Sequence, residues 1–594
     1  MEQLITNYPI TNYLLDYQMT NPNLHIDHLR LCSSGGNTVA LKLGLEQALR
    51  QVRLQPGGLP PHAILVIRRL ESRQPFGLSA AQMYRWQRHI QAQLDELARR
   101  AYRPGKQYIP PDAESVLFYD DVELLISYTR DMLARKTTWY WADLFPDAAY
   151  PGRPTGDQLL TGWQVYPQAV PHALVALKPH EMRSALNSLT QNQLSRLVHL
   201  LHQTYALPGE VLAAAVPDPI LIISSHSPEQ LSTQPQRSTR PAAPWHDWLP
   251  SQLFQQLSPQ AEYILGLCHT LVYRPQQARR NHFAQAAKTW LEQTAFRPTP
   301  DDQLPLAVPE IRPSPSQPTE LIQPDPQAAE TPELPAEFPL PEGAYTSLGG
   351  AIFLVNLLTR LQLPAIIPAL AELNPWELLG AVTADLLSDR FSLHQADPLW
   401  AILNELAGLE PDARWGAALS ASDSLSLPPE WLTLLPTETI ACRLERQDGR
   451  SRLYYQETDL LIADLPDEDG SLDRLISHYD RAAIHLKITG RGAALYPPSS
   501  GDHKGSPLPD FCAPNLAWYV VRMRPFLTHF LDHLTGGEPI ESILRQPATL
   551  YRSRTHVDLR LSLEQISIPM RRAGLDHTPG WLPDFGYILT IYFE

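Results

Sequence analysis

Two pairs of histidines have the spacing that could begin a zinc site. His529 and His533 stand four residues apart in a segment with helical periodicity, and Asp532 lies between them. His199 and His202 stand three residues apart in another such segment. Zinc needs three or four protein ligands, and neither pair has the glutamate that serves as base in a His-Glu-x-x-His site. We predict no complete metal site, with His529 and His533 the nearest candidates, and interpret both pairs as partly buried packing residues.

The acidic run from Asp464 to Gly470 carries oxygen ligands of the kind that calcium prefers. Aligned with an EF-hand loop, it supplies the third, fifth and sixth positions. The first position would be Leu465 and the twelfth Ile476, so both essential oxygen ligands are missing. We interpret the run as a solvated loop that Ser471 caps at the start of a helix.

Nucleophile and phosphate-binding patterns are also incomplete. A strand-like segment leads into the polar run Ser224 to Ser227, but the glycines of a nucleophile elbow are missing. The pair Gly490 and Gly492 has no third glycine, and Lys504 precedes Gly505 instead of following it. The sequence therefore predicts no catalytic residue and no cofactor, and we expect the protein not to be an enzyme.

Charge and cysteine usage limit the possible partners and compartment. The net charge is -15 with a pI near 5.7, so the summed field repels phosphate backbones and we predict no nucleic-acid partner. We interpret the densest basic stretch, Arg99 to Lys106, as the solvated end of a helix. The four cysteines lie far apart, which is typical of a reducing cytoplasm. The chain lacks the features of a signal peptide and a run of about 18 apolar residues, so we predict a cytoplasmic protein without a direct membrane span.

Composition divides the chain into parts. Between Arg297 and Pro341, thirteen prolines alternate with acidic and polar residues. Proline lacks an amide donor and like charges repel, so this stretch is predicted to be extended and disordered. A weaker break runs from Pro228 to Pro244. We predict a multidomain chain with a small α+β region at 1–110, a mainly helical domain at 111–296, a Pro-rich acidic linker at 297–343 and an α+β domain at 344–594.

Local patterns before the linker predict a mixed region followed by helices. We expect a strand at His25 to Leu31, a helix at Thr38 to Val52 and a second strand at His62 to Arg68. Later helices begin at capping residues, which are Ser79, Asp120 or Asp121, and Thr190. The region from about 80 to 295 is therefore predicted to be mostly helical.

After the linker, helices precede a β-meander. The expected helices are Ser347 to Leu361, Pro364 to Leu373, Pro375 to Leu387, Pro398 to Leu406, Ser471 to Tyr479 and Asn515 to Leu534. The expected strands are Ala441 to Glu445, Arg452 to Gln456, Asp459 to Ala463 and Ala482 to Ile488. The fold class is thus mixed α+β, with strands at the C-terminus.

The last forty residues are unusually apolar and rich in turn residues. Val557, Leu559, Leu561 and Leu563 alternate as one face of a strand does, and a final aromatic and β-branched run follows. Between them Gly574 is expected to cap a helix, and Trp581 to pack on the sheet. We predict that ten residues have structural or interaction roles: Trp139, Trp141, Arg571, Arg572, Gly574, Asp576, Pro579, Gly580, Trp581 and Pro583.

The segment Arg571-Arg-Ala-Gly-Leu-Asp-x-x-Pro-Gly-Trp-Leu-Pro583 resembles the end of uncharacterised proteins found with contractile, phage-tail-like injection systems. It is preceded by Thr-His-Val-Asp and followed by a terminal strand. The segments Gly349 to Leu358, Asp397 to Gly408 and Leu59 to Leu70 agree with this resemblance. The resemblance implies that the protein works with such an injection system, and it implies no chemical reaction.

On this basis we expect a structural accessory or assembly factor of such a system, whose partners are other protein components of the particle. The C-terminal domain would dock on one component and the helical domain on another, with the linker setting their reach. Two alternatives stay open: a hydrolytic enzyme whose His, Asp or Glu residues only the fold brings together, and a stand-alone regulatory binding module.

Overall fold

The computed structural model describes most of the chain on both sides of the predicted linker. The described residues are 13–16, 28–31, 43–45, 47, 49, 56–72, 79–104, 109–148, 152–209, 243–295, 343–410, 413–420, 424–435, 439–468, 470–488 and 512–593. The linker at 297–343, apart from residue 343, lies outside the described residues, as do the run Ser224 to Ser227 and most of the break at Pro228 to Pro244. We call residues 56–295 the N-terminal half and 343–593 the C-terminal half.

The N-terminal half begins with a two-stranded antiparallel sheet, β3 (Ile64–Ile67) and β4 (Ser115–Phe118). Before it, β1 (Tyr13–Asp16) pairs with β2 (His28–Leu31). The long helix α2 (Ala80–Arg100) begins at Ser79, whose side chain accepts from the Gln82 amide, as predicted, and it lies against β4. Its buried residues, Trp86, Ile90 and Leu94, recur every four residues, so one helix face meets the sheet.

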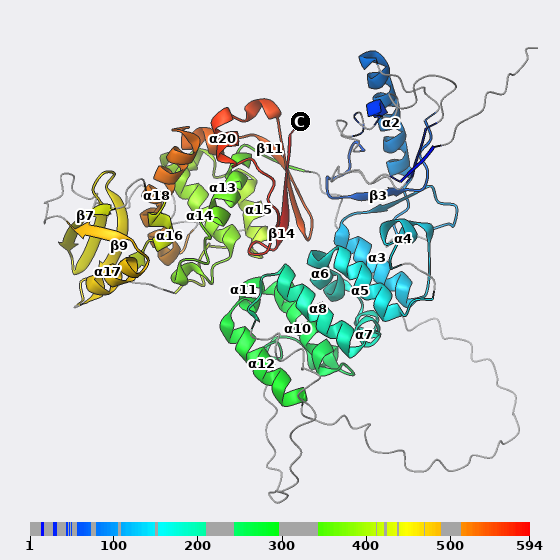
Figure 1. The fold of residues 1–594 in the computed structure, drawn as a ribbon, viewed down its shortest axis with the longest axis horizontal. Coiled ribbons are helices and arrows are strands. Elements are labelled where there is room, and N and C mark those ends of the chain that lie inside the picture. The colour runs from blue at the N-terminus through cyan, green and yellow to red at the C-terminus, as the bar shows by residue number, and fades with distance from the viewer. Residues whose placement is uncertain are drawn as a thin grey trace, which may run out of the picture.

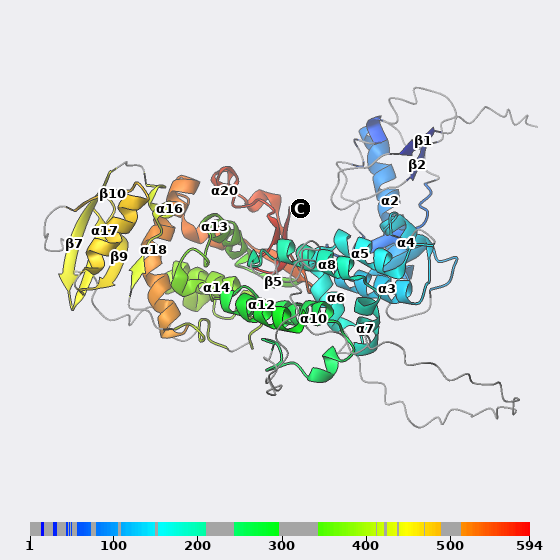
Figure 2. The ribbon, with the colours of Figure 1, turned by 60° about the horizontal axis from the view of Figure 1, so that its bottom comes forward.

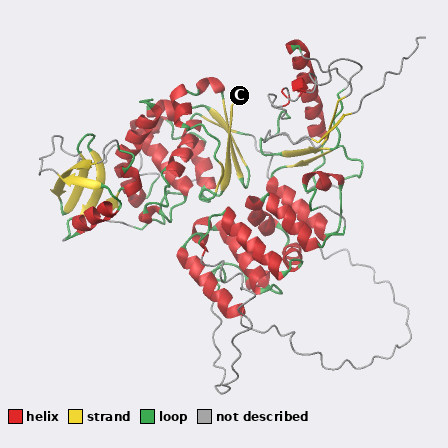
Figure 3. Ribbon diagram, viewed as in Figure 1, coloured by secondary structure: helices red, strands yellow, loops and turns green. Residues whose placement is uncertain are grey.

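Helices make up the rest of the N-terminal half, as Figure 3 shows. They are α3 (Asp121–Leu133), α4 (Trp139–Leu144), α5 (Thr155–Val165), α6 (Val170–Ala176), α7 (Pro179–Asn187), α8 (Gln191–Thr204), α10 (Pro259–Tyr273), α11 (Pro275–Ala278) and α12 (Asn281–Ala295). The predicted caps are confirmed, because Asp120 accepts from the Glu123 amide and Thr190 forms a capping box with Gln193. The core is rich in tryptophan, with Trp163, Trp245 and Trp290 fully buried.

A five-stranded sheet ends the chain. Its strands are β5 (Ala344–Thr346), β11 (Ala548–Arg552), β12 (His556–Leu561), β13 (Gly580–Leu582) and β14 (Tyr587–Phe593), in the order β13-β14-β12-β11-β5. The pair β12 and β14 is parallel and the other pairs are antiparallel. Two register pairs, Val557 with Leu589 and Leu559 with Ile591, bury apolar side chains on one face. The predicted terminal strands are therefore confirmed and built into a sheet.

Helices cover that face around one central helix. They are α13 (Leu354–Arg360), α14 (Pro375–Leu387), α15 (Leu399–Leu406), α18 (Pro514–Thr535), α19 (Ile540–Leu544) and α20 (Ile568–Ala573). All residues of α14 except Glu377 are buried, and α14 contacts α13, α15, α18 and α19. A helix that is buried on nearly every side belongs at the centre of a core.

The predicted β-meander forms an outlying lobe, which we call the meander lobe. It contains β6 (Leu425–Ser426), β7 (Thr439–Gln447), β8 (Arg450–Tyr455), β9 (Leu460–Pro466), α17 (Ser471–Arg481) and β10 (His485–Ile488), and α16 (Pro429–Leu432) follows β6. The strand order is β10-β7-β8-β9-β6. Figures 1 and 2 both place the meander lobe at the end of the C-terminal half far from the N-terminal helices. It joins the core where β9 contacts α18.

The mixed α+β class is thus confirmed, and several local predictions are wrong. The cap of α17 is Gly470 and not Ser471, which is the first residue of that helix. Pro364 to Leu373 contains only the short 3-10 turn Pro368–Leu370, because two prolines four residues apart interrupt helical hydrogen bonding. Asp464 lies in β9 and not in a solvated loop. Leu563 leaves the strand face for a 3-10 turn and is half exposed. No helix among the described residues is long and apolar enough to cross a membrane.

Candidate functional site

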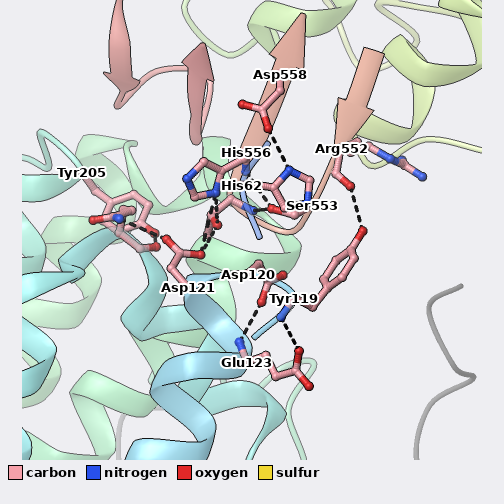
Figure 4. Close-up of polar contacts among 12 residues, drawn as sticks. His62, Tyr119, Asp120, Asp121, Glu123, Tyr205, Arg552, Ser553, His556 and Asp558 are labelled. Atoms are coloured by element: carbon pink, nitrogen blue, oxygen red, sulfur yellow. Dashed lines mark hydrogen bonds and ion pairs between the residues drawn. The ribbon is translucent and has the colours of Figure 1, made fainter. Parts of the chain in front are cut away.

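Polar side chains from both halves converge where the N-terminal half meets the terminal sheet, as Figure 4 shows. Three elements supply them: the loop before β3, the junction of β4 with α3, and the hairpin of β11 and β12. The hairpin turn is tight, since the Ser553 amide donates to the His556 carbonyl and the Ser553 hydroxyl accepts from the Thr555 and His556 amides. We call this cluster the polar junction.

The polar junction contains a buried imidazole and carboxylate that come from opposite ends of the chain. His62 Nδ1 lies 2.8 Å from Asp558 Oδ2, and their side chains are 0% and 1% exposed. An ionised carboxylate only accepts, so the imidazole donates through Nδ1. The second atoms of both groups, His62 Nε2 and Asp558 Oδ1, make no hydrogen bond to a described residue. One polar atom of each side chain is therefore hydrogen-bonded, and the other is buried without a hydrogen bond to a described residue.

A second contact joins the first turn of α3 to the hairpin turn. The Thr555 hydroxyl donates to Asp121 Oδ1, and His556 Nδ1 lies 3.0 Å from the same hydroxyl and 3.9 Å from that carboxylate oxygen. Gln168 donates to the other Asp121 oxygen at 3.1 Å. Asp121 is the first residue of α3, where a negative charge faces the positive end of the helix dipole.

Neighbouring groups show how little water reaches the polar junction. Burial and the adjacent Asp121 raise the pKa of Asp120, the residue that caps α3. Burial lowers the pKa of His172, on α6, to about 4, although Asp121 acts in the opposite direction. Tyr119 donates to the Arg552 carbonyl at 3.4 Å, and burial raises the pKa of its phenol. Near neutral pH the His172 imidazole is therefore uncharged.

A third set of contacts extends the junction to the last strands. Trp581 Nε1 donates to the Thr204 carbonyl at 2.6 Å, and its ring meets the Tyr205 ring edge to face with 5.1 Å between centroids. Arg279 Nη1 donates to the Asp584 carbonyl at 2.6 Å. Trp581 packs against the N-terminal core. The expectation that Trp581 packs on its own sheet is therefore wrong, because it lies on edge strand β13 and reaches the helices instead.

The polar junction resembles part of a catalytic arrangement without giving access to a substrate. An aspartate that accepts from Nδ1 leaves Nε2 of the same imidazole as a potential base, which is how a catalytic triad orients its histidine. A general base must come within hydrogen-bond distance of the proton that it removes. The His62 side chain is completely enclosed. This arrangement can hold the two halves of the chain in a fixed relative position.

The remaining predicted residues serve local folding. Trp141 is buried and donates to Asp131 Oδ2 at 2.9 Å, and Trp139 carries the Arg68 guanidinium over its ring at 5.9 Å. These contacts place the aromatic cluster in the N-terminal core.

In the terminal segment, Gly574 ends α20 with a φ of 69°, as a helix C-cap requires. Arg571 lies 3.7 Å from Asp576 Oδ2, and its guanidinium sits over the Phe593 ring. Gly580 also has a positive φ, and Arg572, Pro579 and Pro583 flank these turns. Trp581 alone of this set contacts the N-terminal half through its side chain.

His529 and His533 both lie on α18 and are not brought together with further ligands. His529 lines a shallow cavity of about 280 Å³ with Thr458, Arg524 and Asp532. Within the described ranges, no group of three or more His, Cys, Asp or Glu residues could hold a metal ion. His202 instead makes a 2.7 Å contact with the Tyr263 hydroxyl in the N-terminal core, and burial lowers its pKa to about 4.

Sequence reasoning missed the polar junction entirely. His62 and Asp558 are 496 residues apart, and Asp121 and Thr555 are 434 apart, so spacing carries no signal of either contact. Comparison with known proteins adds nothing further, because no family model, curated protein or solved structure matches the chain.

Proposed function

We propose that this protein is a non-enzymatic structural accessory or assembly factor of a contractile, phage-tail-like injection system and acts in the cytoplasm through protein–protein contacts. The sequence resemblance supplies the setting. The observation that supports a structural role is the polar junction, whose buried polar groups make contacts between the two halves. A chain that holds two separate cores in one arrangement is suited to presenting two surfaces at a set distance.

The proposed mechanism is bridging. One particle component binds the N-terminal helices and another binds the C-terminal half. The contacts of Trp581, His62 and Asp558 hold these surfaces together, so the junction sets the geometry and the linker only keeps the halves connected. This differs from two domains on a loose tether, in which the linker alone would set the reach.

The test is a pull-down of the tagged chain from cells that express an intact system. We expect sheath, tube or baseplate proteins to be recovered with the chain, two different components together. A double variant, D558A with W581A, weakens the junction without touching the outer surfaces. It should still recover each component singly and lose their joint recovery. If the intact chain recovers no particle protein, the proposed setting is wrong.

A further inference from the structure

An arginine cluster lies where the meander lobe meets α18, and its charge exceeds that of the carboxylate it surrounds. Asp464 on β9 has a side chain that is only 1% exposed. Its Oδ1 accepts from Arg450 Nε at 2.6 Å, and its Oδ2 accepts from Arg522 Nε at 2.8 Å. Both carboxylate oxygens are thus occupied by guanidinium groups, one from strand β8 and one from helix α18.

A third guanidinium stands beside this pair without a hydrogen bond to the carboxylate. Arg452 Nε is 3.6 Å from Asp464 Oδ1, which is an ion-pair distance and too long for a hydrogen bond. Three guanidinium charges surround this one carboxylate. Counted with the adjoining Arg443 and its two partners, Glu445 and Asp459, four guanidinium groups face three carboxylates, which leaves a local excess of one positive charge (4 - 3 = 1). The side chains of Arg450, Arg452 and Arg522 each keep about a fifth of their surface exposed.

Aromatic rings hold the guanidinium groups in place. Trp518 on α18 lies under both Arg450 and Arg522, at 5.6 and 4.1 Å from its ring centroid. On the neighbouring strand, Arg443 lies 5.2 Å from the centroid of Tyr454. Stacking on a ring fixes the plane of a guanidinium, so less side-chain entropy is lost when it binds an anion.

The open part of this sheet face explains why the cluster is accessible. Along β8, Leu453 and Tyr455 are buried while Arg450, Arg452 and Tyr454 are partly exposed, so the arginines share one face of the strand. Helix α18 covers that face at β9, where Asp464 and Arg522 meet. Figures 1 and 2 place this lobe at the outer end of the C-terminal half, away from the polar junction.

We propose that the cluster of Arg450, Arg452 and Arg522 binds carboxylates of a short acidic segment of a partner protein. Guanidinium groups match carboxylate geometry with two parallel hydrogen bonds, and Arg452 has donors to offer. Charge favours a short peptide over a nucleic acid, because a long polyanion would also meet the field of a chain with net charge -15. A segment with a few acidic residues meets mainly the local excess of positive charge.

The proposal is tested with a fluorescein-labelled peptide of alternating glutamate and glycine, added to the full chain and followed by fluorescence polarisation. R452Q should weaken binding on the order of tenfold, because Arg452 is the guanidinium without a hydrogen bond to Asp464. R474Q is the matched control, since Arg474 bonds only within the first turn of α17 in the same lobe. It should bind like the unaltered chain.

Two further measurements test whether the cluster is a peptide-binding site, only an internal ion pair, or a nucleic-acid-binding surface. D464N removes the competing carboxylate and should strengthen peptide binding, with folding checked by circular dichroism. A single-stranded oligonucleotide of equal charge should bind more weakly than the peptide. Unchanged peptide binding by R452Q, or tighter binding of the oligonucleotide, would overturn the proposal. Neither result depends on the pull-down, which tests the setting and the junction.

Discussion

At the residue scale, Asp385 on the central helix α14 is a buried carboxylate with little compensation for its charge. Its side chain is 3% exposed, its Oδ2 makes no hydrogen bond to a described residue, and its nearest cation is Arg524, whose Nη1 is 3.8 Å from Oδ1. Burial raises the pKa of Asp385 from 3.8 to about 6, although Arg524 acts in the opposite direction. Holding this carboxylate charged at neutral pH therefore costs folding free energy.

The sign of the resulting pH dependence follows from linkage. The folded chain binds the Asp385 proton more tightly than the unfolded chain, so protonation stabilises the fold. This contribution is fully present below about pH 4 and is lost as the pH rises through about 6. A shift of about two units corresponds to about 3 kcal/mol. D385N should therefore raise the free energy of unfolding at pH 8 by about 1–3 kcal/mol, and the gain should vanish near pH 4.

Urea denaturation of both proteins across this pH range measures the difference. The control is D480N, because Asp480 is about half exposed and, among the described residues, its ion-pair partner is the exposed His485. Its effect should be small and nearly independent of pH. A D385N variant that is less stable than the unaltered chain at pH 8 would show that the Arg524 contact outweighs the cost of burial.

At the element scale, local patterns predicted what is locally determined. The caps at Ser79, Asp120 and Thr190 were found because a capping side chain bonds to an amide two or three residues away. The meander strands were found because each is a short run of strand-forming residues bounded by polar turn residues. Strand pairing was not found, since β12 pairs with β14 in parallel and β11 pairs with β5 from the distant start of the C-terminal half. Such register depends on distant residues.

The same limit applies to the sites. The aromatic pair Trp139 and Trp141 and the Gly574 cap were predicted because each acts within its own segment. Asp464 was misplaced because nothing near it in the sequence shows that Arg522 will reach it from α18. The direction of Trp581 was wrong for a similar reason, since a strand edge does not reveal which domain covers it.

The end of α20 offers a test of one local prediction. Gly574 has a φ of 69°, and no atom lies within 4 Å of the position that a Cβ would occupy. The cost of a side chain is therefore purely conformational. G574A should lower the free energy of unfolding by about 1 kcal/mol, and G574N by less, because asparagine tolerates the left-handed region. Equal losses for both variants in urea denaturation would point to a steric cause.

At the scale of the whole molecule, strand β12 has two roles. One face buries Val557, Leu559 and Leu561 in the C-terminal core, and the other carries His556 and Asp558 into the polar junction. Because neighbouring residues of a strand point to opposite faces, a single register serves both the core and the contact between halves. The arrangement of the halves is thus tied to the folding of the terminal sheet.

This tie predicts that the halves stay together when the chain between them is cut. A protease site placed between residues 310 and 330 allows cleavage of the folded protein. The two fragments should then elute as one species in size-exclusion chromatography, because the bonds between the halves remain: His62 to Asp558, Thr555 to Asp121 and Trp581 to Thr204. Buried charged groups that lose their partners are costly, which opposes separation.

The matched variant for this experiment is D558A with W581A in the same cleavable chain. It leaves His62 without its carboxylate and removes the indole that bonds to Thr204, so the cleaved fragments should separate. E372Q is the control, because the Arg280 to Glu372 ion pair between the halves is half exposed and contributes little. If fragments of the unaltered chain separate on cleavage, the linker alone holds the halves together. The bridging mechanism would then be wrong, and the protein would be two domains joined by a tether.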